Sequence, residues 1–444
     1  MEPTRRLAMA SPEVTRLLEY EAHALLERLG ELRAFALTLP MVAAATPSIA
    51  AQAGIESYMA AGRDRLRRLV QDFLAWLRSP DGAASTSADA QQRFTFVRMR
   101  FLAVIAQFDV FADALAERSQ HGYGELLAGL DVVAADALEL PGNLYEVPPV
   151  LCHLDRGAGA AIRRARTRMP GGGASPVAII RMPRERMVGA AIASSLVHEA
   201  GHQGAELLGL VAPLREMLAT LAARDPSRRA GWLCFQRWIS EIIADVWGIA
   251  RIGIGATMGL IGVVSLPKPF VMRASTMGPH PPPWIRVKIS AAVGKEMYPD
   301  PQWDRADKLW DELYPLSSAG VEDAAIFRML AALLPDFVRA VLQTRAERLA
   351  GEQLINVFPR ADRTPAALRR LWSQTRGSSD AIARVNPCIA FAAVGQARAD
   401  GAIGAKVEAR LLRRLLRFWA LRATVSTAEA CAHARRPGRF ALTA

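Results

Sequence analysis

The 444-residue chain has little of several residue types, and each shortage excludes a class of protein. It contains four cysteines, Cys152, Cys234, Cys388 and Cys431, which lie far apart and form no C-x-x-C pair. This spacing argues against a disulfide scaffold and against a zinc site built from thiolates, and it favours a reducing compartment. Only 22% of the residues are charged and 51% are hydrophobic, so the sequence predicts a folded protein with a large core.

Long apolar runs are absent too. The N-terminus has no continuous apolar stretch followed by a small-residue cleavage site, which argues against a signal peptide. Residues 252–266 are apolar, but they are too few and too rich in glycine to predict a membrane span. From these features we expect a soluble, cytoplasmic protein.

Lysine is scarce: five lysines and fifty arginines make up the 55 basic residues, and the formal net charge is +12. Because these charges are spread along the whole chain, they indicate an anionic partner only weakly, and we expect no nucleic acid as partner. The segment 406–423 is strongly basic on one side. Its leucines and tryptophan, among them Leu421, favour ordinary packing, but peripheral contact with an anionic membrane surface is an open alternative.

Helical periodicity dominates both ends of the chain. Apolar residues recur at helical spacing over most of 1–140 and again over 301–444. The central part, 141–300, is richer in turns and contains the best strand candidate, VAIIRM at 177–182. We therefore predict a mainly α-helical protein in which a central α+β domain with a small sheet is flanked by two helical regions.

The central region contains two histidines four residues apart, with a glutamate beside the first, in HEAGH at 198–202. On a helix, positions i and i+4 lie on nearly the same face, so His198 and His202 would present both imidazoles to one metal ion. Glu199 lies about 100° further round, where it would not bind the ion but could take a proton from a water on it. The motif therefore indicates a zinc-binding catalytic helix.

Catalytic zinc requires a third protein ligand and keeps a fourth position for water. The metzincin pattern fails, because the glycine and histidine that it requires are replaced by Ala205 and Leu208. Glu206, one turn beyond His202, is a second candidate, but we expect its side chain to reach solvent or a neighbouring arginine.

A glutamate on a second helix is the ligand we favour. Glu241 and Asp245 are four apart, and hence on one face, in the otherwise apolar segment WISEIIADVWG at 238–248. Two carboxylates in such surroundings need a cation or strong hydrogen-bond donors. A zinc ion and its histidines would supply both.

Together these motifs resemble the gluzincin metallopeptidases. HEAGH is followed 39 residues later by EIIAD, and HPPPWIR at 280–286 makes the chain similar to the branch of CAAX prenyl proteases and stress proteases. The resemblance covers about residues 176–290, a quarter of the chain, and implies a zincin-type fold for the central domain. It implies one zinc ion bound by His198, His202 and Glu241.

The resemblance also implies roles for other residues. Glu199 would be the general base, and Asp245 would orient one of the ligand imidazoles. His280 and Arg286 would lie near the substrate and stabilise the oxyanion that forms on the attacked carbonyl. The strand 177–182 would be the edge along which an extended peptide adds as another strand, although a purely structural strand is an equal alternative.

The chain departs from this branch in one respect. Many proteins of the branch have membrane spans beside the zinc helix, whereas here the segment between HEAGH and EIIAD carries several charged residues, which argue against a span. We therefore do not carry over a preference for prenylated substrates. The predicted function is that of a zinc-dependent endopeptidase acting on proteins or peptides. The alternatives are a helical scaffold that keeps zinc only for structure, and an arginine-rich binder of membranes or nucleic acid.

Overall fold

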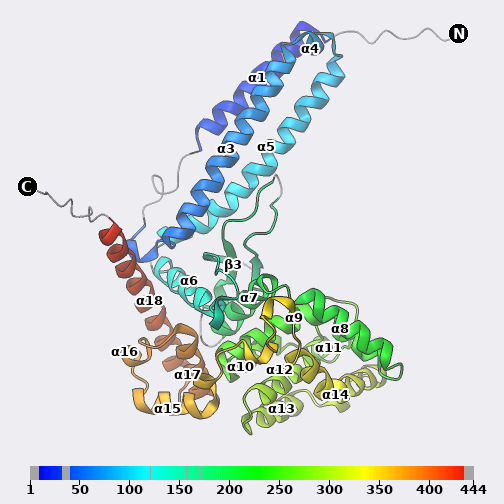
Figure 1. Ribbon diagram of the computed structural model, residues 1–444, viewed down its shortest axis with the longest axis vertical. Helices are drawn as coiled ribbons and strands as arrows, with labels where there is room; N and C mark the ends of the chain where they lie inside the picture. The colour runs from blue at the N-terminus through cyan, green and yellow to red at the C-terminus, as the bar shows by residue number, and fades with distance from the viewer. Residues whose placement is uncertain are drawn as a thin grey trace, which may run out of the picture.

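The computed structural model describes residues 10–32, 41–120, 122–155, 159–169, 172–187, 189 and 191–434. Over these residues the protein is mainly α-helical with a small three-stranded sheet, which confirms the predicted fold class (Figure 1). The longer helices are α1 (Pro12–Gly30), α3 (Ile49–Leu77), α5 (Ser87–Ala116), α6 (Gly124–Leu138), α7 (Ala191–Leu207), α8 (Val211–Arg224), α9 (Arg229–Ile252), α10 (Ile254–Val264), α12 (Pro283–Met297), α13 (Gln302–Leu313), α14 (Val321–Leu342), α15 (Pro365–Thr375), α17 (Pro387–Ala399) and α18 (Ala405–Ala434). Shorter ones are α4 (Pro80–Ala84), α11 (Lys268–Val271) and α16 (Ser379–Ile382).

Helices α1, α3 and α5 form an arm that projects from the rest of the molecule (Figure 1). Ser48 caps the N-terminus of α3, and Thr86 and Asp89 form a reciprocal capping box at the start of α5. The 30 residues of α5 give the arm a length of about 45 Å, at roughly 1.5 Å per residue. Apolar side chains at helical spacing pack between the three helices and form a core of their own.

The sheet consists of β1 (Val150–Asp155), β2 (Ala161–Arg163) and β3 (Ala178–Pro183), in the order β1-β3-β2. The strand predicted at 177–182 is therefore confirmed, with bounds shifted by one residue. Its predicted place at the sheet edge is wrong, because β1 pairs with β3 in parallel on one side and β2 pairs with it antiparallel on the other. An extended peptide could add only at β1 or β2, because neighbouring strands occupy both sides of β3.

The two faces of the sheet contact different cores. Successive side chains of a strand point to opposite faces, so Leu151 and Ile179 join the core of the arm, whereas Cys152 and Ile180 join the larger second core. This second core extends from α6 to α18 and does not divide at residue 300. For example, Phe235 of α9 stacks on Phe337 of α14 with ring centroids 4.1 Å apart. The regions 141–300 and 301–444 thus share their packing.

Helices α7 and α9 lie against each other at the centre of the second core. Small residues make this close approach possible: a Cβ atom added at Gly201 would lie 2.7 Å from Trp247 Cβ and 2.9 Å from Ala244 Cα. A Cβ atom at Gly204 would overlap the Trp247 indole ring, whose Nε1 donates a hydrogen bond to Ala137 O. The indole is fully buried and is held by this hydrogen bond, so an added methyl group would find no free space beside it.

Among the described residues, no helix combines the length and the apolar composition that crossing a membrane requires.

The contact at Gly204 yields the first prediction. Gly204→Ala should destabilise the protein by about 1–3 kcal/mol, because the added methyl group overpacks the interface between α7 and α9. Gly262→Ala in α10 is the matched control, since its Cβ would meet nothing within 4 Å and alanine favours the helix. Thermal unfolding measured by circular dichroism should show a lower midpoint for Gly204→Ala alone. Equal midpoints for the two variants would contradict the proposed close packing.

Candidate metal centre

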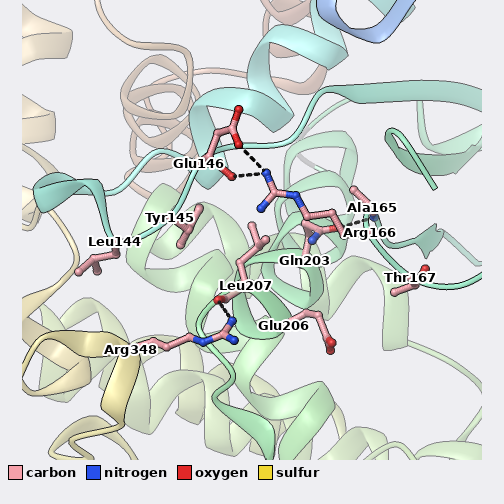
Figure 2. A pocket seen from close by; sticks show the side chains of 10 residues that line it. All are labelled: Leu144, Tyr145, Glu146, Ala165, Arg166, Thr167, Gln203, Glu206, Leu207 and Arg348. Atoms are coloured by element: carbon pink, nitrogen blue, oxygen red, sulfur yellow. Dashed lines mark hydrogen bonds and ion pairs between the residues drawn. The ribbon is translucent and has the colours of Figure 1, made fainter. Parts of the chain in front are cut away.

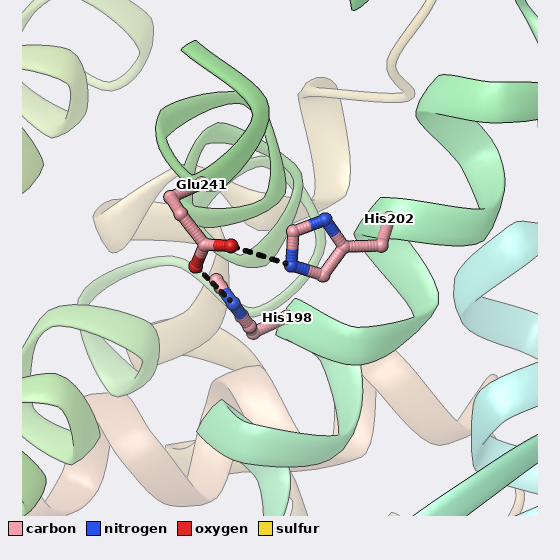
Figure 3. Close-up of side chains that lie close together, drawn as sticks. All are labelled: His198, His202 and Glu241. Atoms are coloured by element: carbon pink, nitrogen blue, oxygen red, sulfur yellow. Dashed lines mark ion pairs between the residues drawn. The ribbon is translucent and has the colours of Figure 1, made fainter. Parts of the chain in front are cut away.

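Three potential ligands converge where α7 and α9 cross. His198 and His202 project from successive turns of α7 toward Glu241 on α9, as Figure 3 shows. His198 Nε2 lies 3.4 Å from Glu241 Oε2, and His202 Nε2 lies 3.5 Å from Glu241 Oε1. One ligand atom from each residue can be chosen so that all three lie within 4.8 Å of one another. This group could therefore hold a metal ion.

The apolar composition of α9 explains why Glu241 faces the histidines. Trp238, Ile242 and Trp247 are completely buried on the core side of the helix. Glu241 and Asp245 occupy the remaining stripe, where their side chains are only 14% and 11% exposed. Such largely buried carboxylates are stable only with cations or hydrogen-bond donors around them.

Asp245 holds His198 in place. Its Oδ1 lies 2.8 Å from His198 Nδ1, so a proton on Nδ1 makes the hydrogen bond and Nε2 is left to face Glu241. Arg286, at the start of α12, donates two hydrogen bonds to Asp245, from Nε at 2.7 Å and from Nη2 at 2.9 Å. Arg286 Nη2 also lies 3.7 Å from Glu241 Oε2. The arginine predicted to face the substrate thus binds the carboxylate that orients the imidazole.

The pKa values in this cluster reflect burial opposed by mutual pairing. Burial acts to lower the pKa of His198, but the charge and hydrogen bond of Asp245 outweigh it and raise that pKa to about 9. Burial and the charge of His198 lower the pKa of His202 to about 4. Burial acts to raise the pKa of Asp245, yet Arg286 and His198 hold it well below its usual range. Burial also acts to raise the pKa of Glu241, but His198 and His202 lower it, so both carboxylates stay ionised, as a cation site requires.

Two further predicted site residues lie at the same place. His280 is in the loop that precedes α12, with its side chain 60% exposed and its Nε2 3.3 Å from Glu241 Oε2. Glu199 is buried on α7. Burial acts to lower the pKa of Arg286, but the charges of Asp245, Glu241 and Glu199 together raise it. The structure thus brings all the predicted site residues into one electrostatic cluster.

Glu206 and the other side chains that could bind a metal lie elsewhere. Glu206, on the last turn of α7, is exposed and pairs with Arg164 at 2.6 Å, as expected. His153 lies on β1 and is not part of the ligand group. Cys152, Cys234 and Cys388 are free and buried, which agrees with the absence of a disulfide scaffold in the described residues; the side chain of Cys431 lies outside them.

A pocket of 440 Å³ at the C-terminal end of α7 is distinct from the ligand group (Figure 2). Gln203 Oε1 accepts a hydrogen bond from Ala165 N, and Arg348 donates one to Leu207 O. These bonds tie the segment after β2 and the segment after α14 to the end of α7. None of the three ligands lines this pocket, and the hydrogen bonds of its lining residues hold the end of the helix.

Comparison with known proteins adds no relative: no family model matches the chain, and neither a curated protein nor a solved structure matches it. The chemistry of the cluster is therefore inferred from its residues and geometry alone.

The ligand group predicts the metal content of the protein. His198→Ala and Glu241→Ala should each reduce the bound metal well below one ion per chain, because two ligands cannot replace three. His153→Ala is the control and should keep the full content. Elemental analysis after dialysis measures this directly. Unchanged metal in either ligand variant would remove that residue from the site.

The hydrogen bond that Asp245 accepts from His198 predicts a smaller effect. Asp245→Asn keeps the size of the side chain but loses the charge that fixes the His198 tautomer, so metal affinity should fall about 10–100-fold. Titration against a competing chelator measures the affinity, and thermal unfolding verifies that the variant is folded. Wild-type affinity in the folded variant would show that Asp245 does not support the site.

Proposed function

We propose that this protein is a zinc-dependent endopeptidase whose active site is the cluster at the crossing of α7 and α9. One observation carries the proposal: the two imidazoles of HEAGH and the Glu241 carboxylate, 39 residues further along, lie within 4.8 Å of one another. Two imidazole nitrogens and one carboxylate oxygen are the donor set of many catalytic zinc sites. The likeness of the motifs to those of gluzincin peptidases agrees with this set.

The number of ligands bears on whether the site is catalytic or structural. A structural zinc ion is enclosed by four side chains, whereas a catalytic one keeps a position open. The ligand group among the described residues has three members. The fourth candidate, His280, is mostly exposed and is not among them. Three ligands would leave the fourth position of a zinc ion for water, which supports catalysis over the alternative of a zinc-stabilised scaffold.

The residues divide the chemistry between them. His198, His202 and Glu241 would hold the ion, and Asp245, braced by Arg286, would keep the His198 Nε2 lone pair directed toward it. When bound, zinc would supply Lewis-acid chemistry, polarising a carbonyl and lowering the pKa of a water. Glu199 would accept the proton from the attacking water and transfer it to the leaving amine.

The remaining polar groups would stabilise charge on the substrate. His280 is the exposed member of the cluster, so its imidazole can reach a bound peptide and donate a hydrogen bond to the oxyanion. Arg286 is committed to Asp245 by two hydrogen bonds and is mostly buried. We therefore assign to Arg286 mainly the positioning of Asp245 and the positive potential of the site.

Glu199→Gln tests the reaction. The amide keeps the shape of the side chain but cannot accept the proton, so peptide hydrolysis should fall at least about 100-fold while the metal content stays at one ion per chain. A survey of cleavage products in native cell extract, comparing wild type with this variant, measures hydrolysis of any protein substrate that the extract contains. Normal cleavage by the metal-loaded variant would refute the role of Glu199.

A further inference from the structure

Helix α18 presents two contrasting sides. Its inner side is buried and packs in the second core through Leu412, Leu415, Leu416 and Trp419, as the sequence predicted. Its outer side is open, and α18 lies at the edge of the molecule (Figure 1). Leu421, expected to pack with the other leucines, is instead 56% exposed on this outer side.

The outer side carries a row of unpaired cations. Lys406, Arg410, Arg413 and Arg414 are exposed, and none forms an ion pair or a side-chain hydrogen bond with another described residue. Arg417 has only a 3.5 Å contact with Glu125. These five side chains and Ala409 line a surface hollow of 410 Å³. Of the two acids in the described part of α18, Glu408 is buried on the inner side, and Glu429 is exposed three turns beyond the last cation of the row, next to Val425.

Apolar side chains continue the same surface. At helical spacing, Val407, Phe418, Leu421 and Val425 fall beside the cations, and all are exposed, Val407 to 53% and Val425 to 57%. Apolar groups next to arginines suit the boundary between lipid headgroups and acyl chains, where the apolar groups are buried and the arginines meet phosphates. Nucleic acid would satisfy the arginines and could stack on Phe418, but it would leave Val407, Leu421 and Val425 without a partner.

We propose that the outer side of α18 is a docking surface for a bilayer that contains anionic lipid. The positive charge attracts the phosphates, and the exposed apolar side chains insert at the headgroup level. The attachment is peripheral, and it holds the remainder of the molecule beside the bilayer. This proposal does not rest on peptidase activity, because it concerns residues outside the metal centre.

Vesicle binding by the full chain tests the proposal. Wild type should sediment with vesicles of phosphatidylcholine and phosphatidylglycerol, should not sediment with phosphatidylcholine alone, and should bind less as salt rises. Each cation removed should lower binding roughly five-fold, so the double charge reversal Arg410→Glu with Arg414→Glu should lower it at least about 25-fold. Removal of metal by a chelator should leave binding unchanged.

Matched variants separate this surface from net charge. Arg305→Glu with Arg328→Glu, at exposed positions of α13 and α14, changes the net charge equally and should bind like wild type. Leu421→Gln should weaken binding while keeping its salt dependence. Equal binding by the α18 variant and wild type, or equal loss in the control pair, would overturn the proposal. So would tight binding of duplex DNA by this surface together with failure to bind the anionic vesicles.

Discussion

The close contact between α7 and α9 is the constraint on which the rest of the structure depends. Glycines at 201 and 204 let the two helices approach until the Trp247 indole fills the space between them. The histidines of α7 and the carboxylates of α9 are rigidly attached to these backbones. The distance between them is therefore set by packing rather than by flexible loops, and a site built in this way needs little reorganisation to receive an ion.

The same contact creates an electrostatic problem that the surrounding residues solve. It places the largely buried carboxylates of Glu199, Glu241 and Asp245 within electrostatic reach of Arg286, an arrangement that is unfavourable unless such positive charge is present. Arg286 supplies one fixed cation from α12, and the His198 imidazole supplies a second when it is protonated. A bound metal ion would take over the second role.

Much of the fold and site could be predicted from the sequence because the signals are local. Helical periodicity identified the helices, and the i, i+4 spacing placed both imidazoles, and likewise Glu241 and Asp245, on single faces. Long-range pairing was not predictable: β1 reads as an apolar run, β2 has three residues, and neither reveals that β3 lies between them. Likewise, no local signal in the sequence indicates that Arg286 pairs with Asp245, 41 residues away, or that Leu421 faces solvent.

The sheet separates the arm from the candidate metal centre. The base of the arm packs on the face of the sheet that carries Leu151 and Ile179, and the opposite face packs on the core around α7. A substitution in the core of the arm therefore alters contacts on one face of the strands, whereas the side chains that align the histidines pack against the other face.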